Sequence, residues 1–354
     1  MKTKTLAAWA AAALLCGCAV PHPPTTQGAI ALANLDDQLQ RSADDPAALD
    51  LWLLRLQFLS DYRVLDRIAG FTEARADDPA GLLRRARARM AAHRFADARA
   101  DLDAAGADPA QRAALLVAIG GAAEALPALQ AQAERRPGFA SHCALARGLA
   151  ALGRLDEADR LYAQALAELD TTSPFPAAAV AFGRGLMWSE QGANKARGAR
   201  FYAEALRLLP GYAAAGVHLA EIEIASGDLA AAEAHLLPVV IDTDEPEALA
   251  LLGELHVRQG HAARGQDEID GARRRFETLL ARHPQAFADH AAEFYLGAGR
   301  DPQRAWTWAR VNLGERPTRR AFELAIRAAE AMGRADEALA LRQAVRGRHA
   351  PRAA

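Results

Sequence analysis

Prolines recur along this chain at intervals that suit a stack of repeated helical units. Nine of the 17 prolines are separated by eight intervals of 28 to 38 residues, which average about 34. Each follows a segment rich in Ala and Leu, and proline cannot continue a helix but is tolerated in the first turn of the next one. They therefore predict where one helical unit ends and the next begins. These nine are Pro46, Pro79, Pro109, Pro137, Pro174, Pro210, Pro246, Pro284 and Pro317.

Four further prolines (Pro127, Pro176, Pro238 and Pro302) fall outside this period, so the period needs independent support. A second spacing supplies it: a small residue, a large apolar residue four positions later, and the proline eight positions after that. The complete pattern occurs as Ala125, Leu129 and Pro137, as Gly198, Tyr202 and Pro210, and as Ala272, Phe276 and Pro284. The pair Ala158 and Tyr162 keeps its first half. Turn glycines are expected at Gly153, Gly192, Gly227, Gly260 and Gly333.

With this period and this spacing, the chain resembles the tetratricopeptide-repeat family over residues 46–348. The resemblance implies an all-α fold, a right-handed α–α superhelical solenoid of about nine tetratricopeptide-like helical hairpins. The small residue lets two antiparallel helices touch, and the large one fills the space between neighbouring units. We expect residues 29–45 to form an N-terminal capping helix that covers the first unit. We expect an Arg-rich last helix as the C-terminal cap and a disordered tail over 349–354.

Two stretches depart from the repeat pattern. Residues 261–275 add about seven residues, which we expect between the two helices of one unit. Residues 60–137 carry poor signatures, and Pro127 is expected to interrupt a helix there. A break in the stack is therefore a possible outcome in that stretch.

Composition narrows the classes of partner. Hydrophobic residues make up 51% of the chain but aromatic residues only 6%, so the core must be built largely from Ala and Leu, which are strong helix formers. The formal net charge is −2, which gives no electrostatic case for nucleic acid as a partner.

The N-terminus has the features of a secretory signal over residues 1–17. Lys2 and Lys4 precede an apolar run of ten residues, too short for a membrane span of ~20 residues. Residues 15–18, Leu-Cys-Gly-Cys, resemble the lipobox of bacterial lipoproteins, which implies that Cys18 is the lipidated first residue of the mature protein. Residues 18–28 would then be a proline-rich tether. The sorting rule of bacterial lipoproteins then implies that the protein is anchored in the outer membrane and faces the periplasm. The alternative is an ordinary signal peptide with an incidental cysteine.

The sequence carries no recognisable catalytic, cofactor or metal motif. His256 and His261 lie near Glu254, but a zinc site needs better-spaced ligands, so we interpret His256 as a packed histidine. Cys143 lies on an apolar helix and is interpreted as an inert core thiol. An acidic cluster is interpreted as a solvated junction before a helix; it comprises Asp242, Asp244, Glu245 and Glu247.

Two groups of side chains are candidates for partner binding. Arg84 and Arg87 share a helix face, as do Arg85 and Arg89, so this helix is either an ordinary solvated surface or a patch for an acidic peptide or lipid headgroup. Trp306 and Trp308 point to different faces of one helix. One of the two is expected in the core, and the other is a candidate aromatic anchor at an interface.

The resemblance implies a scaffold, because tetratricopeptide proteins receive a peptide, helix or subunit in a concave groove lined by their first helices. Together with the lipobox, this predicts an adaptor for protein or peptide partners in assembly of an envelope complex, such as a pilus, secretion, barrel-insertion or polysaccharide-export machine. The alternative is an accessory subunit that tethers an enzyme of envelope or polysaccharide metabolism. An enzyme in its own right would need paired carboxylates in a cleft, and we interpret the carboxylates as helix-surface charges.

Overall fold

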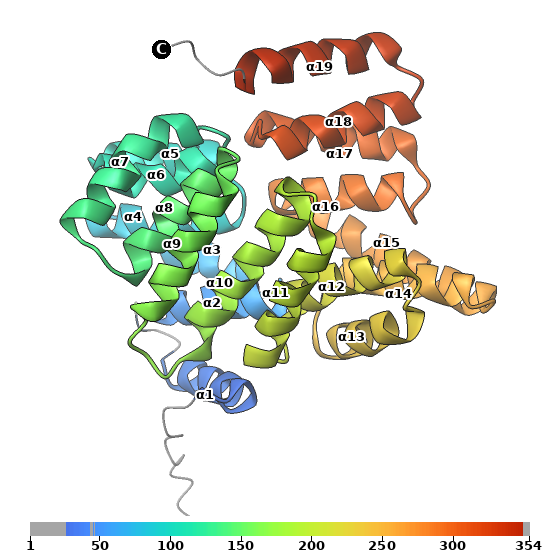
Figure 1. Cartoon of the computed structure of the whole chain (residues 1–354), viewed down its shortest axis with the longest axis horizontal. Helices are drawn as coiled ribbons and strands as arrows, with labels where there is room; N and C mark the ends of the chain where they lie inside the picture. Colours follow the sequence, from blue (N-terminus) through green and yellow to red (C-terminus); the bar gives the residue numbers. More distant parts are fainter. Residues whose placement is uncertain (1–25, 43–44, 46, 350–354) are drawn as a thin grey trace, which may run out of the picture.

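The computed structural model of the chain describes residues 26–42, 45 and 47–349, and these form nineteen α-helices and no strand (Figure 1). The signal, Cys18, most of the tether and residues 350–354 of the tail lie outside the described residues. The first ten helices are α1 (Gly28–Arg41), α2 (Ala48–Leu59), α3 (Val64–Glu73), α4 (Pro79–Ala91), α5 (Phe95–Ala104), α6 (Pro109–Ala118), α7 (Ala122–Arg135), α8 (Phe139–Ala151), α9 (Leu155–Ala167) and α10 (Pro174–Leu186).

A short π-helical turn, η1 (Met187–Gln191), extends α10. The remaining helices are α11 (Lys195–Leu208), α12 (Ala213–Ser226), α13 (Leu229–Asp242), α14 (Pro246–Arg258), α15 (Ala262–Arg282), α16 (Pro284–Leu296), α17 (Pro302–Glu315), α18 (Arg319–Ala331) and α19 (Ala335–His349). From α2–α3 to α18–α19, consecutive helices pack as nine hairpins within the described residues. This confirms the predicted all-α stack of about nine helix pairs.

The prolines mark the hairpin junctions as predicted. Five of them are the first residue of a first helix: Pro79, Pro109, Pro174, Pro246 and Pro284. Pro137, Pro210 and Pro317 lie in the turn just before one, whereas Pro46 lies outside the described residues. Polar caps reinforce these starts. At α6, the Asp108 side chain accepts a hydrogen bond from the Gln111 backbone N–H at 2.9 Å. The Gln111 side chain in turn accepts one from the Asp108 backbone N–H at 2.8 Å.

The spacing of small and large residues is confirmed by burial. Ala125, Ala158 and Ala272 have no exposed surface, because the paired helix packs directly against them. The large partner residues fill the space between neighbouring hairpins and are 0% to 4% exposed: Leu129, Tyr162, Tyr202 and Phe276. An alanine at Gly198 would put its Cβ 2.7 Å from the Ser189 side chain, so this crossing needs glycine.

Two predicted irregularities are absent from the structure. Pro127 does not interrupt α7, which is continuous through it, and consecutive helices from α3 to α8 remain in contact, so the stack does not break there. The extra residues near 261–275 do not form a loop. They lengthen α15 to 21 residues, because their helix-forming side chains continue the second helix of that hairpin.

The solenoid closes on itself, which the sequence did not indicate. Leu65 of α3 belongs to the same apolar cluster as Ile269 and Phe276 of α15. A Cβ on Gly120, after α6, would lie 3.0 Å from the carbonyl oxygen of Pro317, before α18. The early hairpins therefore pack against hairpins formed some 200 residues later in the chain.

Helix α1 covers more than the first hairpin, which is all that a capping helix was expected to cover. It ends at Arg41, and its apolar face reaches beyond the first hairpin, since Ala31 and Leu35 cluster with Phe175 and Tyr212 of later hairpins. The helix therefore links the first hairpin to the middle of the stack. None of the described helices combines the length and apolar character needed to cross a membrane.

Candidate functional site

Closure of the solenoid creates a partly buried polar contact around Tyr62, in the turn between α2 and α3. Its hydroxyl donates a hydrogen bond to Glu245, which lies 183 residues away at the start of α14. The Tyr62 ring meets Phe287 of α16 edge to face, with centroids 4.7 Å apart. Burial and the Glu245 carboxylate raise the pKa of Tyr62 well above its usual value, so the phenol keeps the proton that it donates.

A second buried network surrounds Asp289 on α16. Burial alone would raise the pKa of Asp289, but His290, Arg316 and His93 hold it well below its usual range. His290 also hydrogen-bonds Glu247 at 2.7 Å. Burial would lower the pKa of His290, yet Asp289 and Glu247 raise it well above its usual value, so the imidazolium is stabilised. Burial and nearby Arg316 lower the pKa of His93 to about 4, so that imidazole stays neutral near pH 7.

These contacts correct the interpretation of the acidic cluster as a solvated junction. Glu245 is only 9% exposed, and Asp244 is paired with Arg275 of α15. Asp242 remains exposed. They also correct the view that the carboxylates are helix-surface charges, because Asp101 and Asp289 are 2% and 4% exposed.

The first helices of the hairpins carry even numbers, from α2 to α18. Several of them contact one another across the stack, as α12 does with α2 and α14, and α16 with α14 and α18, and we call their side of the stack the inner face. Arg320 of α18 reaches Glu190 of η1 at 2.8 Å and Glu293 of α16 at 3.0 Å. The His290 side chain, which is 38% exposed, hydrogen-bonds Glu247 on this face. The open groove implied by the family resemblance is therefore partly filled by the chain's own side chains.

A pocket of about 120 Å³ opens on the inner face, and we call it the inner pocket. Its floor includes Leu251 and Phe294, and its lining carries four carboxylates: Glu221, Glu247, Glu254 and Glu293. Three of these are paired with His218, His290 and Arg320, respectively. Glu254 makes no hydrogen bond or ion pair within the described part of the chain. The pocket therefore presents one unneutralised carboxylate beside apolar surface.

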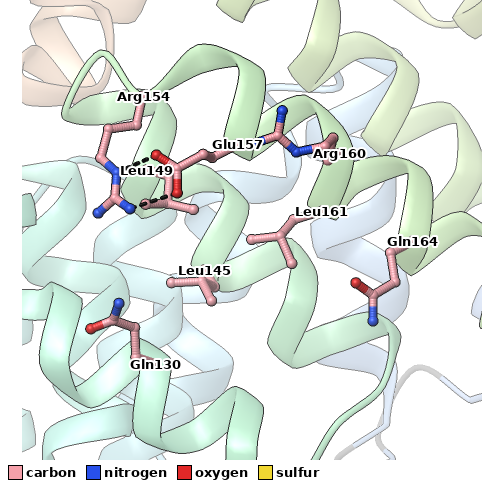
Figure 2. A pocket seen from close by; sticks show the side chains of 8 residues that line it. All are labelled: Gln130, Leu145, Leu149, Arg154, Glu157, Arg160, Leu161 and Gln164. Carbon is pink, nitrogen blue, oxygen red and sulfur yellow. Dashed lines mark hydrogen bonds and ion pairs between the residues drawn. The ribbon is translucent and has the colours of Figure 1, made fainter.

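A larger hollow of about 380 Å³, the outer groove, lies between the second helices α7 and α9, with α8 as its floor (Figure 2). Leu145 and Leu149 of α8 and Leu161 of α9 point into it. Arg154 and Glu157 form a two-pronged ion pair at its rim, with distances of 2.7 and 2.6 Å. Neither hollow was evident in the sequence, because each combines side chains from three helices.

The predicted arginine group is largely neutralised by carboxylates of neighbouring helices. Arg85 and Arg89 pair with Asp101 at 2.7 and 2.8 Å, and both also contact Glu73. Arg87 pairs with Asp50 at 2.6 Å. Arg84 makes no ion pair or hydrogen bond with a described residue. A role for Arg84 and Arg87 in binding a partner stays a prediction.

The two tryptophans differ as expected from their spacing. Trp306 is 8% exposed and lies in the core of the C-terminal hairpins, whereas Trp308 is half-buried against the same cluster. The structure places neither tryptophan with the arginine group or at either pocket, and an anchoring role for them stays a prediction.

The remaining candidates behave as packed residues. His256 is 1% exposed and hydrogen-bonds Glu268, and burial raises the pKa of the Cys143 thiol to about 11. Within residues 26–42, 45 and 47–349, no three His, Cys, Asp or Glu side chains are placed to share a metal ion.

Comparison with known proteins yields structural likeness only. No family model and no curated protein sequence matches the chain. Among solved structures, the Cut9–Hcn1 heterotetramer of APC/C matches 87% of this chain at 14% identity, with a TM-score of 0.47, and the match spans 64% of that chain, less than two thirds of it. A human IFIT1 dimer with PPP-AAAA matches 89% of this chain and 87% of its own at 14% identity, with a TM-score of 0.45. The structure of yeast Tom70 matches 88% of this chain and 90% of the Tom70 chain at 14% identity, with a TM-score of 0.35.

Proposed function

We propose that this protein is an adaptor that binds a segment of a partner protein at the inner pocket. The observation that carries the proposal is the unpaired carboxylate of Glu254 beside Leu251 and Phe294, in a pocket formed by three successive first helices. A lysine or arginine side chain fits this chemistry, because its apolar stem can cover the floor while its charge meets the carboxylate. The partner segment is therefore a basic one.

The charges around the pocket support binding rather than proton transfer to a substrate. Acids and histidines near the pocket are engaged with other side chains of the protein, as Glu247 is with His290 and Asp289 with Arg316. A general acid or base must have its reacting atom within hydrogen-bond reach of a substrate. Here Glu247 and His290 join α14 to α16, which belong to different hairpins, and Asp289 and Arg316 join α16 to the end of α17 within one hairpin, so these groups hold helices together.

We expect Glu254→Arg to reduce capture of the partner about tenfold, because the substitution places a like charge against the basic segment. The measurement is in-cell crosslinking of the tagged, full-length chain, followed by quantitative mass spectrometry. Glu124→Arg on α7 is the matched control, since Glu124 is exposed and lies outside the pocket. Equal capture by wild type and both variants would contradict the proposal. The identity of the captured protein distinguishes an assembly machine from a tethered enzyme.

We further propose that the adaptor is held at the periplasmic face of the outer membrane through a lipid on Cys18, and that it serves assembly of an envelope complex. The support is the lipobox-like sequence of residues 15–18, which the signal-like segment precedes. Cys18→Ser is expected to move the chain from the outer-membrane fraction to the soluble fraction while its helical circular dichroism spectrum stays unchanged. If the variant still sediments with outer membranes, lipidation at Cys18 is not what anchors it.

A further inference from the structure

The outer groove leaves part of its apolar floor uncovered. Leu149 on its floor is 3% exposed, but Leu145 and Leu161 are only partly buried, and the hollow above them holds about 380 Å³. Removing apolar side-chain surface from water is favourable. An apolar group that covered this floor would therefore gain favourable free energy.

The rim of the groove carries an excess of positive charge. Arg154 and Glu157 neutralise each other. Arg160, which also lines the groove, is exposed and has no hydrogen bond or ion pair with a described residue. A ligand that carries a carboxylate next to its apolar surface would complement this arrangement.

The shape of the groove favours a helix as the occupant. Helices α7 and α9 run in the same direction, because each is antiparallel to α8 between them. Rows of side chains on a further helix can pack into the groove between α7 and α9, over α8. The backbone groups of α7, α8 and α9 are engaged within their own helices, so no strand edge is available for an extended peptide.

We propose that the outer groove binds an amphipathic helix of a partner protein. Apolar side chains of that helix, spaced three or four residues apart, cover Leu145, Leu149 and Leu161, and an adjacent Asp or Glu pairs with Arg160. The site is separate from the inner pocket, in helices α7 to α9 rather than α12 to α16, so the adaptor holds two partners at once.

A charge-swap experiment with two synthetic peptides tests this inference. Both are fluorescently labelled amphipathic helices with leucines at i, i+3 and i+7; one carries glutamates and the other lysines beside the leucine face. Binding to the purified full chain is followed by fluorescence anisotropy. We expect the glutamate peptide to bind wild type about tenfold more tightly than the lysine peptide. Arg160→Glu reverses this preference, because the repulsive pair moves from one peptide to the other.

Controls separate the groove from general effects. Leu161→Ser should weaken both peptides, whereas Arg99→Glu, an equal charge change at an exposed position on α5, should alter neither. Glu254→Arg should also leave binding unchanged, so failure of the inner-pocket proposal is distinguishable from failure here. If wild type binds neither peptide, or if Arg160→Glu keeps the wild-type preference, the inference is overturned.

Discussion

Phe276→Ala is expected to lower the free energy of unfolding by about 3–5 kcal/mol, the usual cost of truncating a fully buried aromatic side chain. Phe276 has no exposed surface, and its ring packs against that of Phe294 with centroids 5.0 Å apart. The same cluster includes Leu65 of α3, so the cavity would open where the first hairpin meets the later ones.

Urea denaturation followed by circular dichroism measures this change. Leu339→Ala on α19 is the matched control, because Leu339 is 52% exposed and should cost less than about 0.5 kcal/mol. A loss of under about 1 kcal/mol for Phe276→Ala would show that the repeat position is not a packing position.

Asp289→Asn should destabilise the protein by a comparable amount, about 3–5 kcal/mol near pH 7, because it removes one partner of a buried ion pair. Asparagine keeps the volume of the side chain but not its charge, so Arg316 and His290 would face each other without the carboxylate between them. Asp336→Asn in the exposed first turn of α19 is the surface control.

The destabilisation by Asp289→Asn should depend on pH in a defined direction. The native pKa of Asp289 is depressed below its unfolded value of about 3.9, so its contribution is fully present above that value. The contribution is lost as the pH falls toward the native pKa, and wild type and variant should therefore converge in acid. Urea titrations at neutral pH and below about pH 3 compare the two. Equal stabilities at neutral pH would show that the carboxylate charge contributes nothing.

Local helix contacts were the part of the fold that could be predicted from sequence. Ala272 and Phe276 are buried as their spacing indicated, and Pro284 begins the next first helix. These contacts join helices that are adjacent in the chain. The residues that make them therefore lie within about one repeat and form a spacing that can be recognised in the sequence. The prediction that Pro127 interrupts a helix was wrong, because α7 continues through that residue.

The charged interior could not be predicted in the same way. Tyr62 lies in a stretch with poor repeat signatures, and no sequence pattern marks it as a contact residue. Glu245 belongs to an acidic cluster that the sequence suggested was a solvated junction. Their contact spans 183 residues and depends on how many hairpins complete one turn. The arginines of α4 show the same limit, because Asp50 and Asp101, which neutralise three of them, come from neighbouring helices.

By itself, the sequence of this protein determined the repeat length, the hairpin junctions and the buried small and large positions, because helix pairing within a repeat depends on residues close together in the chain. Only the tertiary structure decided that the stack closes, that paired charges partly fill its inner face, and where the inner pocket and the outer groove lie. The physical reason is cumulative: each hairpin adds a small rotation to the last, and the sum over the stack decides which distant side chains meet.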